Sequence, residues 1–315
     1  MIERWRGMGF MAAALLGGAL LMAGCGGAAA QGAGSESGSD QGSEEGSGAG
    51  LGDDEGGDSG EESSSIPAPP EGARGEETRT MSMDVTLRLT KERRDAGMSA
   101  KNWSFEEGRG VVIEATKGSS VTQLAVIYGH REGKGMEGWT PLPTEGKGYT
   151  LKAKGGEVVV LDADDSSAID AEREVAATEY SYLGRPHPLL AQVLGKSPVD
   201  GDKIKLDSEG ALALIGYMPE MKLGEVSVVY RGSEEYQGRQ AASLDVKFEA
   251  KLTEKETVYG LDLGGSAFVD AKTGWVLSLD LSGKVKPSGE MTIKGKTLKV
   301  GGKGKFTLTR KMTIK

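Results

Sequence analysis

Apolar and polar residues alternate at every second position over long stretches of residues 81–315. One clear run takes its apolar positions from Leu244, Val246, Phe248, Ala250 and Leu252, with polar residues between them. The same pattern recurs over 83–89, 275–281 and 306–314, where Arg310 alone occupies an apolar position. A period of two places one set of side chains on a core and the other in water. This habit is typical of antiparallel sheets.

Shorter runs predict further strands at 110–116, 121–128, 149–153, 157–161, 226–230, 257–263, 291–293 and 297–300. Hairpin loops are predicted at 270–274, at Gly155-Gly156 and at Gly295-Lys296, because Asp and Gly favour tight turns. Residues 167–194 lack alternation and are rich in Ala, Glu and Leu. We expect a helix over about 168–183, an interruption at Pro186 and Pro188, and short helices over 189–194 and 208–215.

The fold class that follows is mainly β, with α+β at the margin. We expect one β-rich domain over 81–315, built as a curved antiparallel sheet or half-barrel with a helical insertion at about 168–195. Two smaller β domains that divide near residue 196 are the alternative. The chain has a single cysteine, so packing must stabilise the fold without a disulfide within the chain.

A short apolar run from Met8 to Met22 follows Arg4 and Arg6 and leads to Cys25. A basic start, an apolar core and small residues are the layout of a cleaved secretory signal. The core is too short and too rich in glycine for a transmembrane helix, which needs about 20 residues. We therefore predict that residues 1–25 form a signal peptide, cleaved between Gly24 and Cys25. An ordinary signal with a chance cysteine is the other interpretation.

The stretch that ends at Cys25 resembles the lipobox of bacterial lipoproteins. The resemblance implies that the cysteine carries lipid and that the protein is anchored to a membrane of the bacterial cell envelope through its N-terminus. Gly26 stands where Asp would be the usual cue for retention in the inner membrane. The resemblance therefore favours the outer membrane, on either its periplasmic or its surface face.

Residues 26–80 consist almost entirely of Gly, Ser, Ala, Asp and Glu. Such a stretch cannot bury enough apolar surface to fold, so we predict a disordered acidic tether. The tether carries a net charge of −11, and residues 81–315 carry +1. The low pI of the whole chain is therefore no guide to the charge of a binding surface.

No motif for catalysis or metal binding has the spacing that its chemistry needs. Residues 133–138 match G-x-G-x-x-G, but Pro141 and Pro143 rule out the helix that must follow. The acidic cluster from Asp162 to Asp165 departs from a calcium loop, and His130 and His187 are the only histidines. We predict no catalytic residue, metal or cofactor, and a protein that is not an enzyme. An envelope hydrolase that uses paired carboxylates is the alternative.

The last 33 residues are strongly basic. Residues 283–315 hold ten lysines and arginines against Glu290 alone, mostly at the alternate positions that face water. One interpretation is a solvated strand edge that resists aggregation. The other is a contact surface for an anionic membrane, with no role in binding nucleic acid. The candidate contacts are Lys294, Lys296, Lys299, Lys303, Lys305 and Lys311.

Turn motifs over about 145–285 resemble a family of β-rich bacterial lipoproteins to which no activity is assigned. They are a Lys-x-Tyr strand at 147–149, a Leu-Gly-x-Pro step at 183–186, a Pro-Val-x-Gly-Asp turn at 198–202 and an Asp-x-x-Thr-Gly hairpin at 270–274. The strand-rich pattern of this family is similar to that of half-barrel lipoprotein carriers, which hold acyl chains on a concave sheet. We expect a monomer that presents a non-catalytic β domain for binding or structural work, with a lipid or an envelope protein as the possible partner.

Overall fold

A computed structural model describes residues 66–91, 94–135, 141–293 and 295–315. These residues lie within one compact unit, Ser63–Lys315. The predicted signal peptide, Gly24, Cys25 and Lys294 lie outside the described residues, as do most of the tether and residues 136–138 of the glycine motif.

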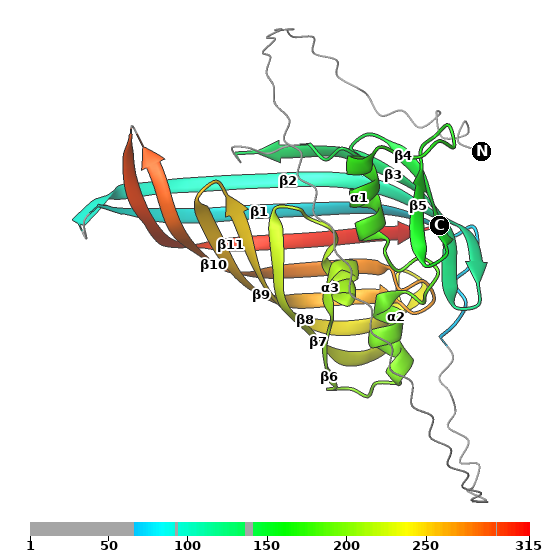
Figure 1. Ribbon diagram of the computed structural model, residues 1–315. Helices are drawn as coiled ribbons and strands as arrows, with labels where there is room; N and C mark the ends of the chain where they lie inside the picture. Colours follow the sequence, from blue (N-terminus) through cyan, green and yellow to red (C-terminus); the bar gives the residue numbers. More distant parts are fainter. Residues whose placement is uncertain (1–65, 92–93, 136–140, 294) are drawn as a thin grey trace, which may run out of the picture. The chain divides into compact units, whose positions relative to one another are not determined.

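The unit is a single antiparallel sheet of eleven strands that does not close on itself, which confirms the predicted fold class. Its order is β5-β4-β3-β2-β1-β11-β10-β9-β8-β7-β6 (Figure 1). Strands β1 to β5 form one meander and β6 to β11 form a second, so only the pairing of β1 with β11 joins strands distant in sequence. The first meander is β1 (Arg74–Lys91), β2 (Arg94–Lys117), β3 (Ser120–Lys134), β4 (Gly148–Lys154) and β5 (Glu157–Leu161). The second is β6 (Lys203–Lys205), β7 (Met221–Tyr236), β8 (Arg239–Glu254), β9 (Thr257–Asp270), β10 (Val276–Ile293) and β11 (Lys296–Ile314).

The helices lie between the two meanders in the chain and cover one face of the sheet at one end, as Figure 1 shows. We call this covered face the inner face. The segment contains α1 (Asp170–Glu179), α2 (Pro188–Gln192), the 3₁₀ turn η2 (Leu194–Lys196) and α3 (Ser208–Ile215). Pro188 is the first residue of α2, a position where its missing N–H costs nothing, so it begins a helix where we expected an interruption.

Glycines at inward positions let the central strands approach and bend sharply. A Cβ on Gly265 would lie 1.8 Å from the carbonyl oxygen of Asp280, and one on Gly283 would lie 2.1 Å from that of Asp262. Gly304 is restricted by a neighbouring strand in the same way. Only glycine fits where a neighbouring backbone is so close, and glycine kinks of this kind produce curved sheets.

The curvature brings together strands that are far apart in the sheet order. Lys101 on β2 forms an ion pair with Glu254 on β8, although four strands separate them. Nη1 of Arg131 on β3 lies 3.5 Å from a carboxylate oxygen of Glu220, just before β7. Since both contacts span the inner side, the two ends of the sheet curl towards each other without pairing.

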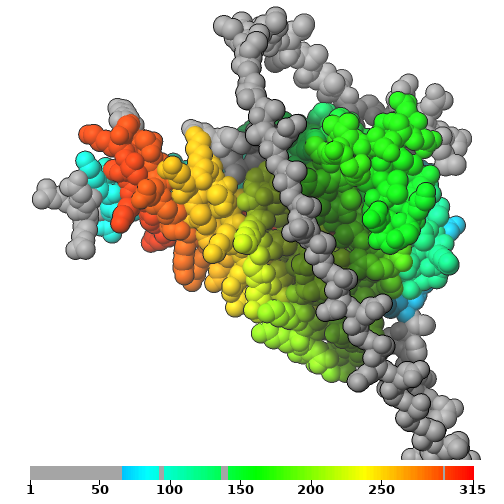
Figure 2. Space-filling model, viewed as in Figure 1, coloured from blue at the N-terminus to red at the C-terminus, as the bar shows by residue number. Residues whose placement is uncertain are grey.

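Side chains fill the space that the curl encloses. Buried apolar residues of β1 and of β7 to β11 pack against α2 and α3, and a second cluster lies between α1 and strands β2 to β5. In the space-filling view, the helical segment in green forms a continuous surface with the strands that it covers (Figure 2). The inner face is therefore the hydrophobic core of the unit.

The structure differs from the sequence-based expectation in two places. β1 begins at Arg74, inside the stretch 26–80 that the sequence assigns to the tether, because Glu77 and Arg79 are buried there by ion pairing. At the start of β10, Val276 and Ser278 are buried although alternation predicts that both face water. The register of β10 against β9 shifts between these two residues, so simple alternation fails.

The predicted turns occur as expected at the ends of β4 and β9. Gly155 and Gly156 both adopt positive φ. Oδ1 of Asp270 accepts hydrogen bonds from the backbone N–H groups of Lys272 and Thr273, and Gly274 has φ of 75°. Asp and Gly are suited to these roles in turns.

Candidate functional site

Charged side chains at inward positions form a buried network at the helical end of the sheet. We call it the arginine–glutamate cluster, and it comprises Glu77 and Arg79 (β1), Glu107 and Arg109 (β2), Arg131 (β3), Glu179 (α1) and Arg310 (β11). The strand registers place opposite charges beside one another, since Glu77 pairs with Arg109 and Arg79 with Glu107. Buried charges are tolerated when they are paired in this way.

Glu77 is the centre of the cluster. Its Oε1 accepts hydrogen bonds of 3.0 Å from Nη2 of Arg109 and from Nε of Arg310, and its Oε2 accepts a third of 3.0 Å from Nη2 of Arg310. The pair with Arg310 is therefore bidentate, the strongest geometry for a carboxylate and a guanidinium.

Arg310 also fixes the end of α3 to the sheet. Its Nη1 donates hydrogen bonds to the carbonyl oxygens of Ala213 and Leu214, at 2.8 and 2.6 Å. These carbonyls belong to the last turn of the helix, where no intrahelical partner exists and the helix dipole favours a cation. Arg79 holds the chain just after α3 in a similar way, because its Nη2 donates a hydrogen bond of 3.1 Å to the carbonyl oxygen of Tyr217.

The remaining carboxylates link the sheet to its neighbours. Glu107 forms ion pairs with Arg79 and with Nε of Arg131, the latter at 2.6 Å. Glu179 at the end of α1 pairs with Arg109 and accepts a hydrogen bond of 3.1 Å from the hydroxyl of Tyr128. Each carboxylate thus joins two different elements.

The arginines keep Glu77 and Glu107 ionised. Burial alone would raise the pKa of Glu77, but Arg109 and Arg310 more than offset burial and hold that pKa well below its usual range. Burial would likewise raise the pKa of Glu107, and Arg79 and Arg131 lower it instead. A carboxylate held in its charged form cannot donate a proton as a general acid. The cluster is therefore suited to fixing elements in place and not to proton transfer.

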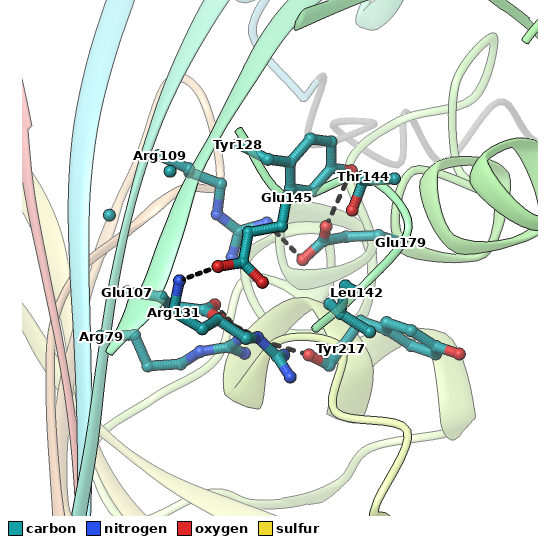
Figure 3. A pocket seen from close by; sticks show the side chains of 12 residues that line it. Arg79, Glu107, Arg109, Tyr128, Arg131, Leu142, Thr144, Glu145, Glu179 and Tyr217 are labelled. Atoms are coloured by element: carbon teal, nitrogen blue, oxygen red, sulfur yellow. Dashed lines mark hydrogen bonds and ion pairs between the residues drawn. The ribbon is translucent and has the colours of Figure 1, made fainter. Parts of the chain in front are cut away.

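Two small cavities adjoin the cluster. The first, with a volume of about 20 Å³, is lined by Arg79, Arg109, Tyr128, Thr144 and Glu145, among others (Figure 3). The second, of about 40 Å³, lies against Tyr182, His187, Trp275 and Arg310. Cavities of this size hold one or a few water molecules. Neither has room for an acyl chain.

His187 is buried in the second cavity's wall as a neutral imidazole. Its Nδ1 accepts a hydrogen bond of 3.3 Å from the backbone N–H of Leu189, which caps the start of α2. Burial, with a smaller contribution from Arg310, lowers the pKa of His187 to about 3. His130, in contrast, is exposed and lies 3.5 Å from Glu145.

The acidic loop after β5 is a local turn. Oδ1 of Asp162 accepts hydrogen bonds from the backbone N–H groups of Asp164 and Ser166, at 2.9 and 3.1 Å. Its other oxygen accepts from the hydroxyl of Ser166. Side chains of Asp commonly bond their own backbone in this way to stabilise a turn.

The predicted surface contacts lie on β11. Lys296, Lys299, Lys303, Lys305 and Lys311 are all exposed. β11 pairs with β1 on one side and β10 on the other, so it lies in the middle of the sheet. The interpretation of these lysines as protection for a sheet edge is therefore wrong, because β11 has no free edge.

Sequence reasoning missed the arginine–glutamate cluster. The signal lay in the phase of the alternation, because Arg310 occupies an apolar position of its run. Glu77 and Arg79 likewise continue the inward phase of Met81 and Met83 towards the N-terminus. Charged residues in the inward phase of several strands indicate a buried ion-pair network.

No family model and no curated protein matches the chain. Among solved structures, the chain is similar to one described as "Lipid-protein interactions in lipovitellin", with a TM-score of 0.34 and 8% identity over 78% of this chain. It spans about a quarter of that protein's length, 25%. A mutant Rh. blastica porin gives a TM-score of 0.20 at 10% identity, over 74% of this chain and 99% of the porin. A structure described as "Asymmetric conductivity of engineered proteins" gives 0.19 at 11% identity, over 76% and 100% of the two chains.

Within the part of the chain that the structure describes, no helix combines the length and the apolar character needed to cross a bilayer.

Proposed function

We propose that this protein is a lipid-anchored lipoprotein of the bacterial envelope, in which the acidic tether presents a non-catalytic β domain for binding or structural work. The anchor is Cys25, at the end of the lipobox-like stretch. Several acyl chains on one residue are enough for stable attachment to a membrane. The outer membrane is the proposed location, since position 26 holds glycine and not the aspartate that is the usual cue for retention in the inner membrane.

The filled inner face is the observation that carries the non-catalytic part of the proposal. Two cavities of about 20 and 40 Å³ adjoin the arginine–glutamate cluster. Ligand pockets in proteins usually measure hundreds of Å³. A lipid or an envelope partner would therefore bind the outside of the sheet, without entering the core.

The paired carboxylates weaken the alternative of an envelope hydrolase. A glycosidase needs one carboxyl group that can donate a proton and a second that is free to act as base or nucleophile. Glu77 and Glu107 are instead held in ion pairs with arginines, which lower the pKa of both. We therefore favour binding or structural work over catalysis.

The anchor is tested by the full chain with Cys25→Ser, expressed in a bacterium that processes lipoproteins. We expect the variant to leave the membrane fraction for the soluble fraction with its far-UV circular dichroism unchanged. A mass increase from attached acyl chains should occur in the parent protein and be absent from the variant. A parent without acyl mass, or a variant that stays in the membrane, would show that the anchor is wrong.

The binding role is tested by native mass spectrometry and crosslinking of protein taken from its own envelope. Co-purification of a lipid or one recurring crosslinked partner is the expected result. Preparations that contain the bare chain alone, with no crosslinked partner, would leave only the structural version of the proposal. Hydrolysis of an envelope polysaccharide that stops in Glu107→Gln or Glu179→Gln would overturn the non-catalytic assignment.

A further inference from the structure

Three neighbouring strands place a compact group of cations on the outer face, opposite the helices. We call it the basic band, and it consists of Arg88 (β1), Lys284 and Lys286 (β10), and Lys303 and Lys305 (β11). All five side chains are exposed. Strands in a sheet lie about 4.8 Å apart, and alternate residues on one strand lie about 7 Å apart. The five cations therefore cover one continuous patch.

The centre of the band is a pair of like charges. Lys284 stands directly opposite Lys305 in the register of β10 and β11. Like charges in this arrangement repel and destabilise a sheet. Among the residues that the structure describes, no ion pair or hydrogen bond involves the ammonium group of either lysine. Each lysine also stands opposite an aspartate on its other neighbouring strand. An anion from outside would relieve the repulsion that remains between the two ammonium groups.

Some exposed lysines elsewhere on the surface have carboxylate partners within the chain. Nζ of Lys315 lies 2.7 Å from Glu76, and Nζ of Lys205 lies 3.3 Å from Glu225. The basic band has Asp84 beside Lys305 and Asp262 beside Lys284 in the strand registers, one at each rim. The four lysines of the band and these two carboxylates together carry a net charge of +2.

The shape and the rim of the band favour a membrane over a small ligand. The band lies on the broad outer face, and the two cavities described above lie on the other side of the sheet. Met98 stands opposite Arg88 on β2 and is 74% exposed, so an apolar side chain adjoins the cations. Cations that meet lipid phosphates, next to an apolar side chain that enters the headgroup region, are typical of proteins that bind a bilayer surface.

We infer that the basic band docks the outer face of the sheet onto the surface of a bilayer that contains anionic lipids. The inference deepens the proposed function, which supplies the nearby membrane, but the contact itself does not depend on the lipid on Cys25. Once docked, the band orients the helical face of the sheet away from the bilayer. The tether then limits how far the domain can move, while the band determines which face meets the membrane.

The test measures binding of the unlipidated full chain, Cys25→Ser, to vesicles by sedimentation. Vesicles of phosphatidylglycerol and phosphatidylcholine are compared with vesicles of phosphatidylcholine alone. We expect binding to the anionic vesicles only, and a steep loss of binding as salt is raised, because salt screens exposed charges. Each cation near an anionic surface strengthens binding about fivefold. The triple substitution Lys284→Gln, Lys303→Gln and Lys305→Gln should therefore weaken binding on the order of 100-fold.

The matched control removes three exposed lysines outside the band, with Lys117→Gln, Lys154→Gln and Lys203→Gln. This control should bind nearly as well as the parent. The band variant should have nearly the melting temperature of the parent, because substitutions at exposed positions change stability little. Its melting curve shows whether a loss of binding comes from unfolding. Equal binding to neutral vesicles, no binding to anionic vesicles, or equal losses in the two triple variants would each overturn the inference. Because every protein in this test lacks the anchor, its failure would leave the lipid anchor on Cys25 untouched.

Discussion

Glu77 and Arg310 are 233 residues apart in the chain and form a bidentate ion pair, with both hydrogen bonds measuring 3.0 Å. The pair joins β1 to β11, where the first meander of the sheet meets the second. Through its remaining nitrogen, Arg310 holds the last carbonyl groups of α3. One side chain therefore connects both halves of the sheet with the helical segment.

Arg310→Met should lower the free energy of unfolding by about 3–5 kcal/mol, the usual result of removing one partner from a buried ion pair. The variant leaves Glu77 with Arg109 alone and leaves the carbonyl groups of Ala213 and Leu214 without these hydrogen bonds. Urea denaturation followed by circular dichroism measures the loss. Lys311→Met, on the exposed neighbouring position, should change stability by less than about 0.5 kcal/mol. Equal effects of the two substitutions would contradict the role given to Arg310.

Stability should fall between pH 6.5 and pH 5 because of His187. In the folded state the pKa of this histidine is about 3, well below its ordinary value of 6.5. Below pH 6.5 the unfolded chain takes up a proton that the folded chain does not, so the stabilisation is complete above pH 6.5 and declines as the pH falls. The expected loss is about 2 kcal/mol by pH 5. Urea denaturation at several pH values measures it.

The control for His187 is His187→Asn, because Asn can still accept the hydrogen bond at the start of α2. This variant should unfold with the same free energy at pH 6.5 and pH 5. A decline as steep as that of the parent would mean that another group is responsible.

A second decline in stability should begin below about pH 4.5 and come from the carboxylates of the cluster. The folded-state pKa values of Glu77 and Glu107 are lowered, so the unfolded chain is protonated first and the stabilisation disappears as the pH falls towards those values. Glu107→Gln should flatten the dependence of unfolding free energy on pH in this range. Glu106→Gln, on the exposed side of the same strand, should leave the slope as in the parent.

Two adjacent glycines on β9 should respond in opposite ways to alanine. A Cβ on Gly265 would lie 1.8 Å from the carbonyl oxygen of Asp280, whereas on Gly264 the nearest atom is 3.7 Å away. Gly265→Ala should therefore cost about 3 kcal/mol through overpacking. Gly264→Ala, which meets only ordinary contacts, should be neutral or slightly stabilising. Thermal unfolding of the two variants provides the comparison, and equal melting temperatures would show that the curvature does not require Gly265.

Alternation was enough to predict a curved antiparallel sheet, and composition was enough to locate the helical segment. The predicted strand at 157–161 matches β5, while the predicted run at 110–116 is only part of β2, which extends from Arg94 to Lys117. The rest of β2 was hidden because its inward positions include the charged residues Lys101, Glu107 and Arg109, which are largely covered and form ion pairs with other strands. A sequence pattern shows that a charged residue occupies a position where alternation expects an apolar one, but it does not show which residue pairs with that charge.

The site was harder to predict than the fold. The lysines on β11 could be named from the sequence, but only the strand order shows that Lys284 of β10 stands opposite Lys305. Arg88 joins them from a strand about 200 residues earlier in the chain, through the pairing of β1 with β11. The cluster around Glu77 is assembled in the same way from five separate elements, and no spacing along the chain encodes those contacts.

The pairing of β1 with β11 must find its register without help from a turn, because more than 200 residues separate the two strands. Most hairpins elsewhere in the sheet are aligned by short loops, but here a slip of one residue would exchange the two faces of β11. Such a slip would bring Lys311 inward, against the apolar core, and would send Arg310 into water. Glu77 would then be left without its bidentate partner. The buried pair thus selects the register of β1 against β11, since it makes this alignment of the two meanders far more stable than an alignment shifted by one residue.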